Sequence, residues 1–346
     1  MSSRSRFETA SWKLDRPPTG IRFSPDGRLL HAYDGRTIYT WNVPGFEEVR
    51  RFSLDESEHS REGHCRFING GKSILLIASD DNSEEGIHHL TVRDLESCTL
   101  NVQADIHIEH YGLLMILFDR AENLLLLRDC GGMSHFVEFP SCVRVRSVRF
   151  DPSVFAERGG VDSMVFSPDE TELWGVCGFD EPTGYREYLA AFEPRTGKWL
   201  RRQQPNKGNH IDGLRLTPRA DALLAVEEGA LCFRDPTSWE LLRKVDLAGS
   251  LQKGWGRSGP ALAFAPSSPL VALSCEYNTR VCIADYESPK LIGVFDVDED
   301  FCVRLLSFSP DGRYLAIASY DVQNEVRVWD VSEVQAKRGS RRRTNG

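Results

Sequence analysis

The sequence predicts an all-β protein built from seven repeated units of four short antiparallel strands. Three observations predict this fold class: one turn motif recurs at a regular interval, apolar and polar residues alternate before it, and further short apolar runs follow each copy. The clearest copies occupy residues 21–30 and 306–315, and a third begins at Met164. A recurring unit of this size is typical of repeat architectures.

Each unit can be located by the large apolar residue that ends its first run. Successive anchors lie 44 to 51 residues apart, and they are Phe23, Phe67, Phe118, Phe166, Leu216, Phe264 and Phe308. The anchors span nearly the whole chain. The 346 residues therefore predict one ring of units, instead of the roughly two or three domains that the length alone suggests.

The chemistry of the first copy explains its shape. Apolar and polar residues alternate over 21–24, and a period of two predicts a strand. Pro25 then presets the backbone φ angle for a turn, and Asp26 and Gly27 supply turn hydrogen bonding and a permissive backbone. The motif is therefore a hairpin turn between two antiparallel strands.

Two more strands follow each hairpin. Third strands are expected at 37–42, 90–94, 188–193, 231–235, 280–285 and 325–330. Fourth strands are expected, for example, at 47–54, 240–245 and 290–295. Four short antiparallel strands per unit form a propeller blade, so the sequence predicts a seven-bladed β-propeller of four-stranded antiparallel blades.

The ends of the third strands carry a family resemblance. Trp329-Asp330 is an intact Trp-Asp ending, and the other endings are Trp41-Asn42, Arg93-Asp94, Phe139-Pro140, Phe192-Glu193, Arg234-Asp235 and Ala284-Asp285. Gly63-His64 precedes the second unit. On these residues the chain resembles the WD40-repeat β-propeller family over about residues 8–333, with degenerate repeats. The family's buried His–Ser/Thr–Asp–Trp network is incomplete in every blade, and the fold itself serves many functions.

The two ends of the chain are expected to close the ring. The last unit has three strands, and residues 8–14, with Trp12 and Leu14 on one face, can supply the fourth. This pairing would remove an open sheet edge. The alternative is a disordered leader over 1–18. The predicted organisation is a leader at 1–7, one propeller at 8–336, and a disordered basic tail at 337–346.

Composition narrows the class of protein. The chain has 42 Lys and Arg against 51 Asp and Glu, a net charge of −9, which lacks the basic excess of a nucleic-acid binder. Its longest apolar runs, 113–118 and 124–127, are far below the ~20 residues of a membrane helix. The first residues lack the apolar run of a secretory signal, and the nine scattered cysteines include no Cys-x-x-Cys pair. We expect a cytoplasmic, intracellular chain.

The loops suggest a binding face. Connections between second and third strands share one face of such a ring with the blade-to-blade segments, and many acidic residues fall there, Asp34 and Asp129 among them. The acidic residues predicted to bind a partner are Asp80, Asp81, Glu227, Glu228, Asp296, Asp298, Asp300 and Asp321. Acidic loops of this kind suit a basic protein segment. The alternative is that the charges merely solvate the loops.

Basic residues are fewer on the same face. Arg201 and Arg202 belong to this sector, and Trp255 lies between Lys253 and Arg257 in a long linker. A tryptophan beside two cations is a candidate contact hot spot. The alternative is that Trp255 packs back onto the fifth and sixth blades.

The usual catalytic and metal-binding signatures are missing from the sequence. Residues 296–300 lack the glycine and distal glutamate of a calcium loop, and His88, His89 and the His107/His110 pair have no partners at zinc-ligand spacing. No Gly-x-Ser-x-Gly elbow or phosphate-binding glycine loop occurs. Small buried side chains are expected at Cys177, Cys232 and Cys282. We therefore expect no catalytic residue, cofactor or metal.

Three functions remain as hypotheses. The first is a non-enzymatic scaffold that presents an acidic loop face to a protein partner, with no membrane contact and with nucleic-acid contact confined to the basic tail. The second is a propeller hydrolase or lactonase with a metal or carboxylate site at the channel mouth, formed by residues such as His64, Asp80, Glu227 and Asp321. The third is a structural propeller that closes a larger assembly. The sequence assigns no oligomeric state.

Overall fold

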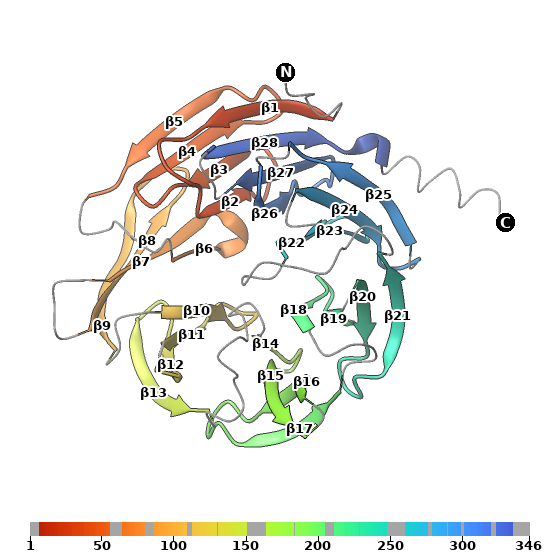
Figure 1. The fold of residues 1–346 in the computed structure, drawn as a ribbon. Helices are drawn as coiled ribbons and strands as arrows, with labels where there is room; N and C mark the ends of the chain where they lie inside the picture. The colour runs from red at the N-terminus through yellow and green to blue at the C-terminus, as the bar shows by residue number, and fades with distance from the viewer. Residues whose placement is uncertain are drawn as a thin grey trace.

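Seven four-stranded antiparallel sheets stand around a ring in the computed structural model of the chain (Figure 1). The fold class and the blade number predicted from the sequence are confirmed. The structure describes residues 7–55, 64–79, 86–108, 113–129, 131–150, 164–182, 184–204, 211–227, 229–247, 260–275, 279–288, 290–298, 301–319 and 323–334.

Each blade runs from an innermost strand at the channel to an outermost strand at the rim. The innermost strands are β2 (Gly20–Phe23), β6 (Cys65–Ile68), β10 (Leu113–Phe118), β14 (Met164–Phe166), β18 (Ile211–Leu216), β22 (Leu262–Phe264) and β26 (Val303–Phe308). The second strands are β3 (Leu29–Tyr33), β7 (Ser73–Ser79), β11 (Leu124–Asp129), β15 (Leu173–Glu181), β19 (Leu223–Glu227), β23 (Leu270–Cys275) and β27 (Tyr314–Ser319).

The outer half of each blade is a second antiparallel pair. The third strands are β4 (Thr37–Asn42), β8 (Ile87–Asp94), β12 (Met133–Glu138), β16 (Gly184–Phe192), β20 (Ala230–Arg234), β24 (Arg280–Asp285) and β28 (Glu325–Asp330). The outermost strands are β5 (Glu48–Ser53), β9 (Leu100–His107), β13 (Val143–Arg149), β17 (Trp199–Gln203), β21 (Leu241–Asp246), β25 (Lys290–Asp296) and β1 (Glu8–Lys13). The seven sequence anchors all lie on innermost strands.

The N-terminal strand closes the ring, as predicted. β1 pairs antiparallel with β28, with Trp12 opposite Val326, so blade 7 takes its outermost strand from the start of the chain (Figure 1). The Trp12 ring stacks on Trp41 of blade 1 at a centroid distance of 4.4 Å. Phe7, which the sequence placed in the leader, packs edge-on against Phe295 at 5.0 Å. Residues 1–6 and the basic tail lie outside the described residues and stay predictions.

The hairpin turns are built as the motif predicts. The Ser24 hydroxyl donates to the Asp26 carboxylate at 2.6 Å and accepts from the Leu29 amide at 2.9 Å. The hydrogen bond from Ser24, followed by that from the Arg28 amide, lowers the pKa of Asp26. Ser309 repeats the arrangement with Asp311 in blade 7. The turn is therefore closed by its own side chains.

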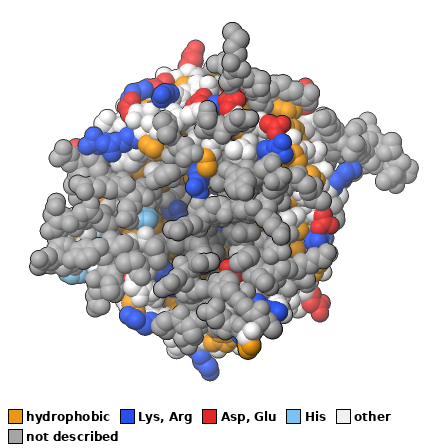
Figure 2. Space-filling model, in the orientation of Figure 1, with side chains coloured by type: hydrophobic (Ala, Val, Ile, Leu, Met, Phe, Trp, Pro, Cys, Tyr) orange, Lys and Arg blue, Asp and Glu red, His pale blue; other side chains and the backbone are white. Residues whose placement is uncertain are grey.

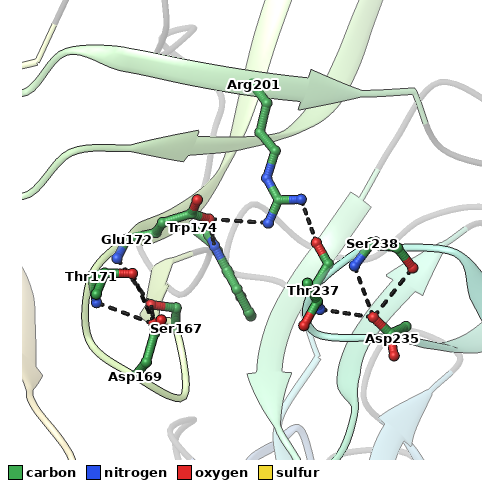
Figure 3. Close-up of polar contacts among 9 residues, drawn as sticks. All are labelled: Ser167, Asp169, Thr171, Glu172, Trp174, Arg201, Asp235, Thr237 and Ser238. Carbon is green, nitrogen blue, oxygen red and sulfur yellow. Dashed lines mark hydrogen bonds and ion pairs between the residues drawn. The ribbon is translucent and has the colours of Figure 1, made fainter.

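The turns between third and fourth strands have their own cap. Asp235 accepts hydrogen bonds from the amides of Thr237 and Ser238 at 2.9 and 2.8 Å (Figure 3). Asp94, at the same position of blade 2, accepts from the Ser97 amide at 2.7 Å. The aspartates that end the third strands, where the family motif has its Asp, thus hold the following turn.

Neighbouring blades are joined by arginines on their outermost strands. Arg201 of β17 donates to the Glu172 carboxylate at 3.1 Å and to the Thr237 carbonyl of the next blade (Figure 3). Its guanidinium also lies 4.1 Å from the centre of the Trp239 ring. Arg50 of β5 reaches the Glu96 carbonyl of blade 2 in the same way. Arg201 therefore contacts turns at one end of the blades. The sequence analysis had placed it among the loops at the other end.

The hydrophobic core is divided among the blade interfaces. Each of seven clusters of buried residues joins two neighbouring blades, including the cluster between blade 7 and blade 1. That cluster contains Tyr39, Trp41, Val326 and Val328, all almost fully buried. Burial of apolar area stabilises the ring, and every interface contributes its own share.

Closure by the N-terminal strand makes a testable prediction. Trp12→Ala removes a half-buried ring that stacks on Trp41, and we expect it to lower the free energy of unfolding by about 2 kcal/mol. The matched control is Lys13→Ala on the exposed face of the same strand, which should change stability by less than about 0.5 kcal/mol. Urea unfolding measures both, and equal stability of the two variants would contradict the closure.

A buried histidine in blade 1 predicts a pH dependence. Burial, followed by the charge of Arg50, lowers the pKa of His31 to about 4. The side chain is 1% exposed and lies 3.0 Å from the Thr40 hydroxyl. Because the folded-state pKa is below the unfolded value of 6.5, His31 folds uncharged. Its contribution to stability is complete above pH 6.5 and is lost as the pH falls toward 4.

The loss should reach about 3 kcal/mol at pH 4, from about 1.4 kcal/mol per pKa unit. His31→Gln keeps a polar partner for Thr40 but cannot gain a proton, so its stability should fall less steeply between pH 6.5 and 4. Urea unfolding of both proteins across this range is the measurement. Parallel pH curves for the two proteins would show that His31 does not become charged on unfolding.

Candidate functional site

The strand order separates the two faces of the ring. Within each blade the first and third turns lie at one end of the sheet, which we call the turn face. The connection between second and third strands lies at the other end, together with the segment that leads to the next blade. We call this second end the loop face. The predicted partner-binding residues fall, in sequence, within or next to the segments that the strand order assigns to the loop face.

Three of the predicted residues are among those that the structure describes: Glu227, Asp296 and Asp298. The others lie outside the described residues, so their predicted role stays a prediction: Asp80, Asp81, Glu228, Lys253, Trp255, Arg257, Asp300 and Asp321.

Asp296 ends β25 at the surface. Its side chain is 78% exposed and accepts a hydrogen bond from Arg280 Nε at 2.6 Å. Arg280 is itself 37% exposed, so this ion pair is formed in water, where such pairs contribute little to stability. The Asp296 carboxylate is therefore available to an incoming partner.

Asp298 has a different environment. Its carboxylate lies 2.7 Å from the guanidinium of Arg327, a β28 residue whose side chain is only 8% exposed. Arg327 also pairs with Glu325 at 2.9 Å and lies over the Phe301 ring at 4.4 Å. Burial alone would lower the pKa of Arg327, but the hydrogen bonds that it donates to Glu325 and Asp298 outweigh burial and raise that pKa. Asp298 thus anchors the blade-to-blade segment onto the closing blade.

The structure corrects the prediction that Glu227 lies on the partner-binding surface. It is 2% exposed and forms two hydrogen bonds with Arg234, at 3.0 Å from Nε and 2.6 Å from the terminal nitrogen. Glu227 ends β19, and its side chain points into the blade. Arg234 occupies the position of the family's tryptophan, and the Glu227 carboxylate compensates its buried charge. A carboxylate in a buried ion pair does not face a partner.

Two other acidic residues of the predicted face are also internal. Asp34 accepts from the Thr37 amide at 2.8 Å and from the Tyr39 hydroxyl at 2.9 Å. Asp129 accepts from the Met133 amide at 2.8 Å and lies 3.1 Å from His135 Nε2. Both are buried. Counting acidic residues by loop therefore overstates the charge on the loop face.

The described residues give no support to the hydrolase alternative. No group of three or more His, Cys, Asp and Glu side chains that could hold a metal ion is found among them. Burial raises the pKa of the Cys232 thiol to about 12 and also raises that of Cys177. His88 is fully buried, whereas the adjacent His89 points to the other side of β8, 2.7 Å from Asp105. The predicted burial of Cys177, Cys232 and Cys282 is confirmed.

The sequence analysis missed a set of arginines at the channel. Arg22, Arg66 and Arg215 each directly precede an anchor, and Arg304 lies nearby on β26. Arg66, Arg215 and Arg304 line a cavity of about 460 Å³ between innermost strands. The signal was present: aligning the repeats on their anchors puts arginine directly before the anchor in three of the seven.

The family match spans the outermost strand of blade 6 and the first three strands of blade 7. Residues 290–330, which run from β25 to the end of β28, match the family model described as "WD domain, G-beta repeat". The chain is a seven-bladed β-propeller in which one repeat matches this family model. The matched repeat is the one with the intact Trp329-Asp330 ending.

Solved structures agree on the fold. One chain of the structure titled "Crystal Structure of Mitotic Checkpoint Complex" aligns with a TM-score of 0.63 at 15% identity, covering 96% of this chain and 97% of that one. In all, 1574 solved chains match, so the fold by itself does not select one function. A comparison with curated proteins found no match. None of the described helices is long and apolar enough to span a membrane.

The contrast between Glu227 and Asp296 makes a testable prediction. Glu227→Gln leaves the buried Arg234 charge uncompensated, and we expect a loss of about 3 kcal/mol or more in the free energy of unfolding. Asp296→Asn breaks an exposed pair and should cost less than about 1 kcal/mol.

Denaturant unfolding compares the two variants with the parent chain. The double variant Glu227→Leu/Arg234→Met removes both charges together and should be more stable than Glu227→Gln. A Glu227→Gln protein as stable as Asp296→Asn would show that the pair is not buried as described.

Proposed function

We propose that this propeller is a non-enzymatic, WD40-like protein-interaction scaffold whose loop face binds a protein partner. The observation that carries this proposal is the difference between its two faces. The turn face is made of short turns that repeat from blade to blade, such as those of Ser24 and Ser309. The loop face is made of connections that differ in length and composition.

The lengths of these connections support the proposal. The segment between β13 and β14 covers residues 150–163, and the one between β21 and β22 covers 247–261. The connection between β11 and β12 covers only 130–132. Binding residues concentrate on variable loops that a rigid scaffold positions, and the loop face has that character here.

We infer that the partner contacts acidic residues of this face and one basic sector beside them. Asp296 is the described member of the acidic set, with its carboxylate exposed. The further members are Asp80, Asp81, Glu228, Asp300 and Asp321, and the basic sector is Lys253, Trp255 and Arg257. Carboxylates would steer a basic segment toward the ring, and Trp255 would bury apolar area at the contact.

A similar chain of known structure and the state of the cysteines are both consistent with a role as an intracellular scaffold. The similar chain of known structure belongs to a structure titled as a complex, so a propeller of this shape is found in an assembly. The eight cysteines in the part of the chain that the structure describes form no disulfide. A chain without disulfides is typical of a reducing compartment, and we place the scaffold inside the cell, in the cytoplasm.

Charge reversal at Asp296 tests the acidic face. Asp296→Lys should reduce capture of the partner from an extract of the native cell by at least about fivefold, because it replaces attraction for a basic segment by repulsion. Asp298 is left intact because it holds Arg327. The matched control is Glu47→Lys, an exposed residue of the turn face with the same change of charge.

Quantitative mass spectrometry of captured proteins is the measurement, with thermal unfolding to show that both variants are folded. A partner that is lost with Asp296→Lys and retained with Glu47→Lys supports the acidic face. Equal retention by both variants contradicts it, and equal loss from both would point to a general effect of net charge.

A further inference from the structure

One seam between neighbouring blades brings two arginines together. Arg146 lies on β13 of blade 3, and Arg195 lies in the turn between β16 and β17 of blade 4. We propose that this seam, at the rim of the ring, binds the phosphate group of a phosphorylated protein segment. Arg195 belongs to the turn face, so the site is separate from the loop face. Failure of either proposal leaves the other unaffected.

The position of Arg146 is one that two other blades use for a contact between blades. Arg50 of β5 donates to the Glu96 carbonyl, and Arg201 of β17 donates to the Thr237 carbonyl (Figure 3). Both arginines directly follow the extra residue of a β-bulge in their strand, and so does Arg146. The three arginines are therefore equivalent, and each is directed toward the third turn of the next blade.

The turns that these arginines approach differ in one residue. Glu96, Thr237 and Arg195 occupy the same place, two residues after the Asp or Glu that ends the repeat motif. Blade 2 thus has an acidic residue and blade 5 a neutral one where blade 4 has an arginine. Like charges that face each other across an interface are unfavourable. The seam between blades 3 and 4 therefore has a charge arrangement that the other two seams lack.

Packing places the turn of Arg195 directly against β13. A Cβ on Gly197 would approach Val148 Cγ1 to 2.7 Å and the Arg149 carbonyl to 3.0 Å. Gly197 also has a φ of +70°, a conformation that side chains rarely adopt. Glycine here lets the turn lie close to the strand. Because Arg195 precedes Gly197 by two residues and Arg146 precedes Val148 by two, both arginines lie beside this contact.

The two arginines lack an anionic partner. The Arg146 guanidinium lies 4.2 Å from the centre of the Phe136 ring, and Arg195 is exposed. Burial, followed by the charge of Arg195, lowers the pKa of Arg146. Glu193, in the same turn as Arg195, accepts a hydrogen bond from the Thr196 hydroxyl. In the part of the chain that the structure describes, no carboxylate pairs with either guanidinium, so an anion between them would be attracted by both.

The chemistry of the pair favours phosphate over a carboxylate. A guanidinium group binds phosphate through two parallel hydrogen bonds. A phosphorylated side chain carries a charge of about −1.5 to −2 and three acceptor oxygens. One phosphate can therefore neutralise both arginines and accept hydrogen bonds from both. A carboxylate, with one charge and two oxygens, can satisfy them only in part.

Apolar residues beside the arginines favour a protein segment as the carrier of the phosphate. Val143 and Val145 of β13 are 57% and 55% exposed, more than the other exposed large hydrophobic residues that the structure describes. Figure 2 shows Lys or Arg side chains beside hydrophobic ones at the lower rim of the drawn face, where Figure 1 places β13 and β17.

A protein segment that lies along this outermost strand would cover the two valines while its phosphate reaches the arginines. The exposed large hydrophobic residues in the described ranges include no aromatic ring on which nucleic-acid bases could stack. The surface therefore suits a phosphorylated protein segment better than a nucleic acid.

A pool of synthetic peptides tests the site in the full chain. Each peptide carries one phosphoserine flanked on both sides by randomised residues, and a second pool carries unphosphorylated serine instead. We expect the purified chain to bind the immobilised phosphorylated pool about tenfold or more strongly than the other pool, because charge-assisted hydrogen bonds form only with phosphate. Arg146→Gln/Arg195→Gln should remove this preference.

The matched control is Arg28→Gln/Arg219→Gln, which removes the same charge from residues that are 84% and 75% exposed on the turn face. Its preference for the phosphorylated pool should equal that of the parent chain. Equal binding of the two pools by the parent chain, or equal loss from both double variants, would overturn the proposal. So would binding of single-stranded DNA, or of vesicles containing phosphatidylinositol bisphosphate, by a chain that does not prefer the phosphorylated pool.

Arg195→Glu separates loss of the site from loss of the fold. It gives blade 4 the acidic residue that blade 2 has at Glu96, so attraction to Arg146 replaces repulsion across the seam. We expect a higher midpoint of thermal unfolding together with loss of the preference for phosphorylated peptides. A lower midpoint would show that the two residues do not face each other, and a retained preference would show that phosphate binds elsewhere.

A further measurement uses the unaltered chain. Phenylglyoxal modifies accessible arginines, and peptide mapping reports each site. The phosphorylated pool should protect Arg146 and Arg195 while leaving Arg28 and Arg219 reactive, and the unphosphorylated pool should protect none of them. Equal reactivity of Arg146 and Arg195 with the two pools would contradict phosphate binding at the seam.

Discussion

The pairing of β1 with β28 is the contact on which the rest of the molecule depends. Without β1, the third strand of blade 7 would be an open edge, and edges of this kind invite pairing with other chains. β1 also brings Trp12 against Trp41, which completes the seventh of the interfaces that form the core. The loop face and the channel both exist only when blades 7 and 1 meet, so the proposed partner-binding face depends on this closure.

Different blades use different residues for the polar contact between the second and third strands, which explains why the repeats look degenerate. In three blades a carboxylate at or directly after the end of the second strand contacts a polar side chain of the third strand. Blade 1 uses Asp34 with Tyr39, and blade 3 uses Asp129 with His135. Blade 5 uses the buried pair of Glu227 and Arg234. All three blades keep four paired strands, so the family's single network can be lost without loss of the fold.

The fold could be predicted because local sequence patterns determine its strands and turns. Examples are the alternation of apolar and polar residues before Phe23 and the Ser-Pro-Asp-Gly turn after it. The candidate site could be predicted only in part. Asp296 and Glu227 both follow or end a strand and look alike in sequence, yet one is exposed and the other is paired with Arg234. That difference depends on where the Arg234 side chain points. The alternation of apolar and polar residues along the sequence does not predict that direction. The channel arginines required the seven repeats to be superposed, since a single Arg before a Phe carries no signal.

Hydrogen–deuterium exchange of the intact chain, read by mass spectrometry, tests the closure most directly. If β1 completes blade 7, amides of residues 8–13 should exchange as slowly as those of 325–330, because the two strands share one ladder of hydrogen bonds. Both should be protected to a degree comparable with other outermost strands such as β25. Exchange of residues 8–13 at the rate of an unstructured peptide, with 325–330 exposed as an edge, would contradict the closed ring.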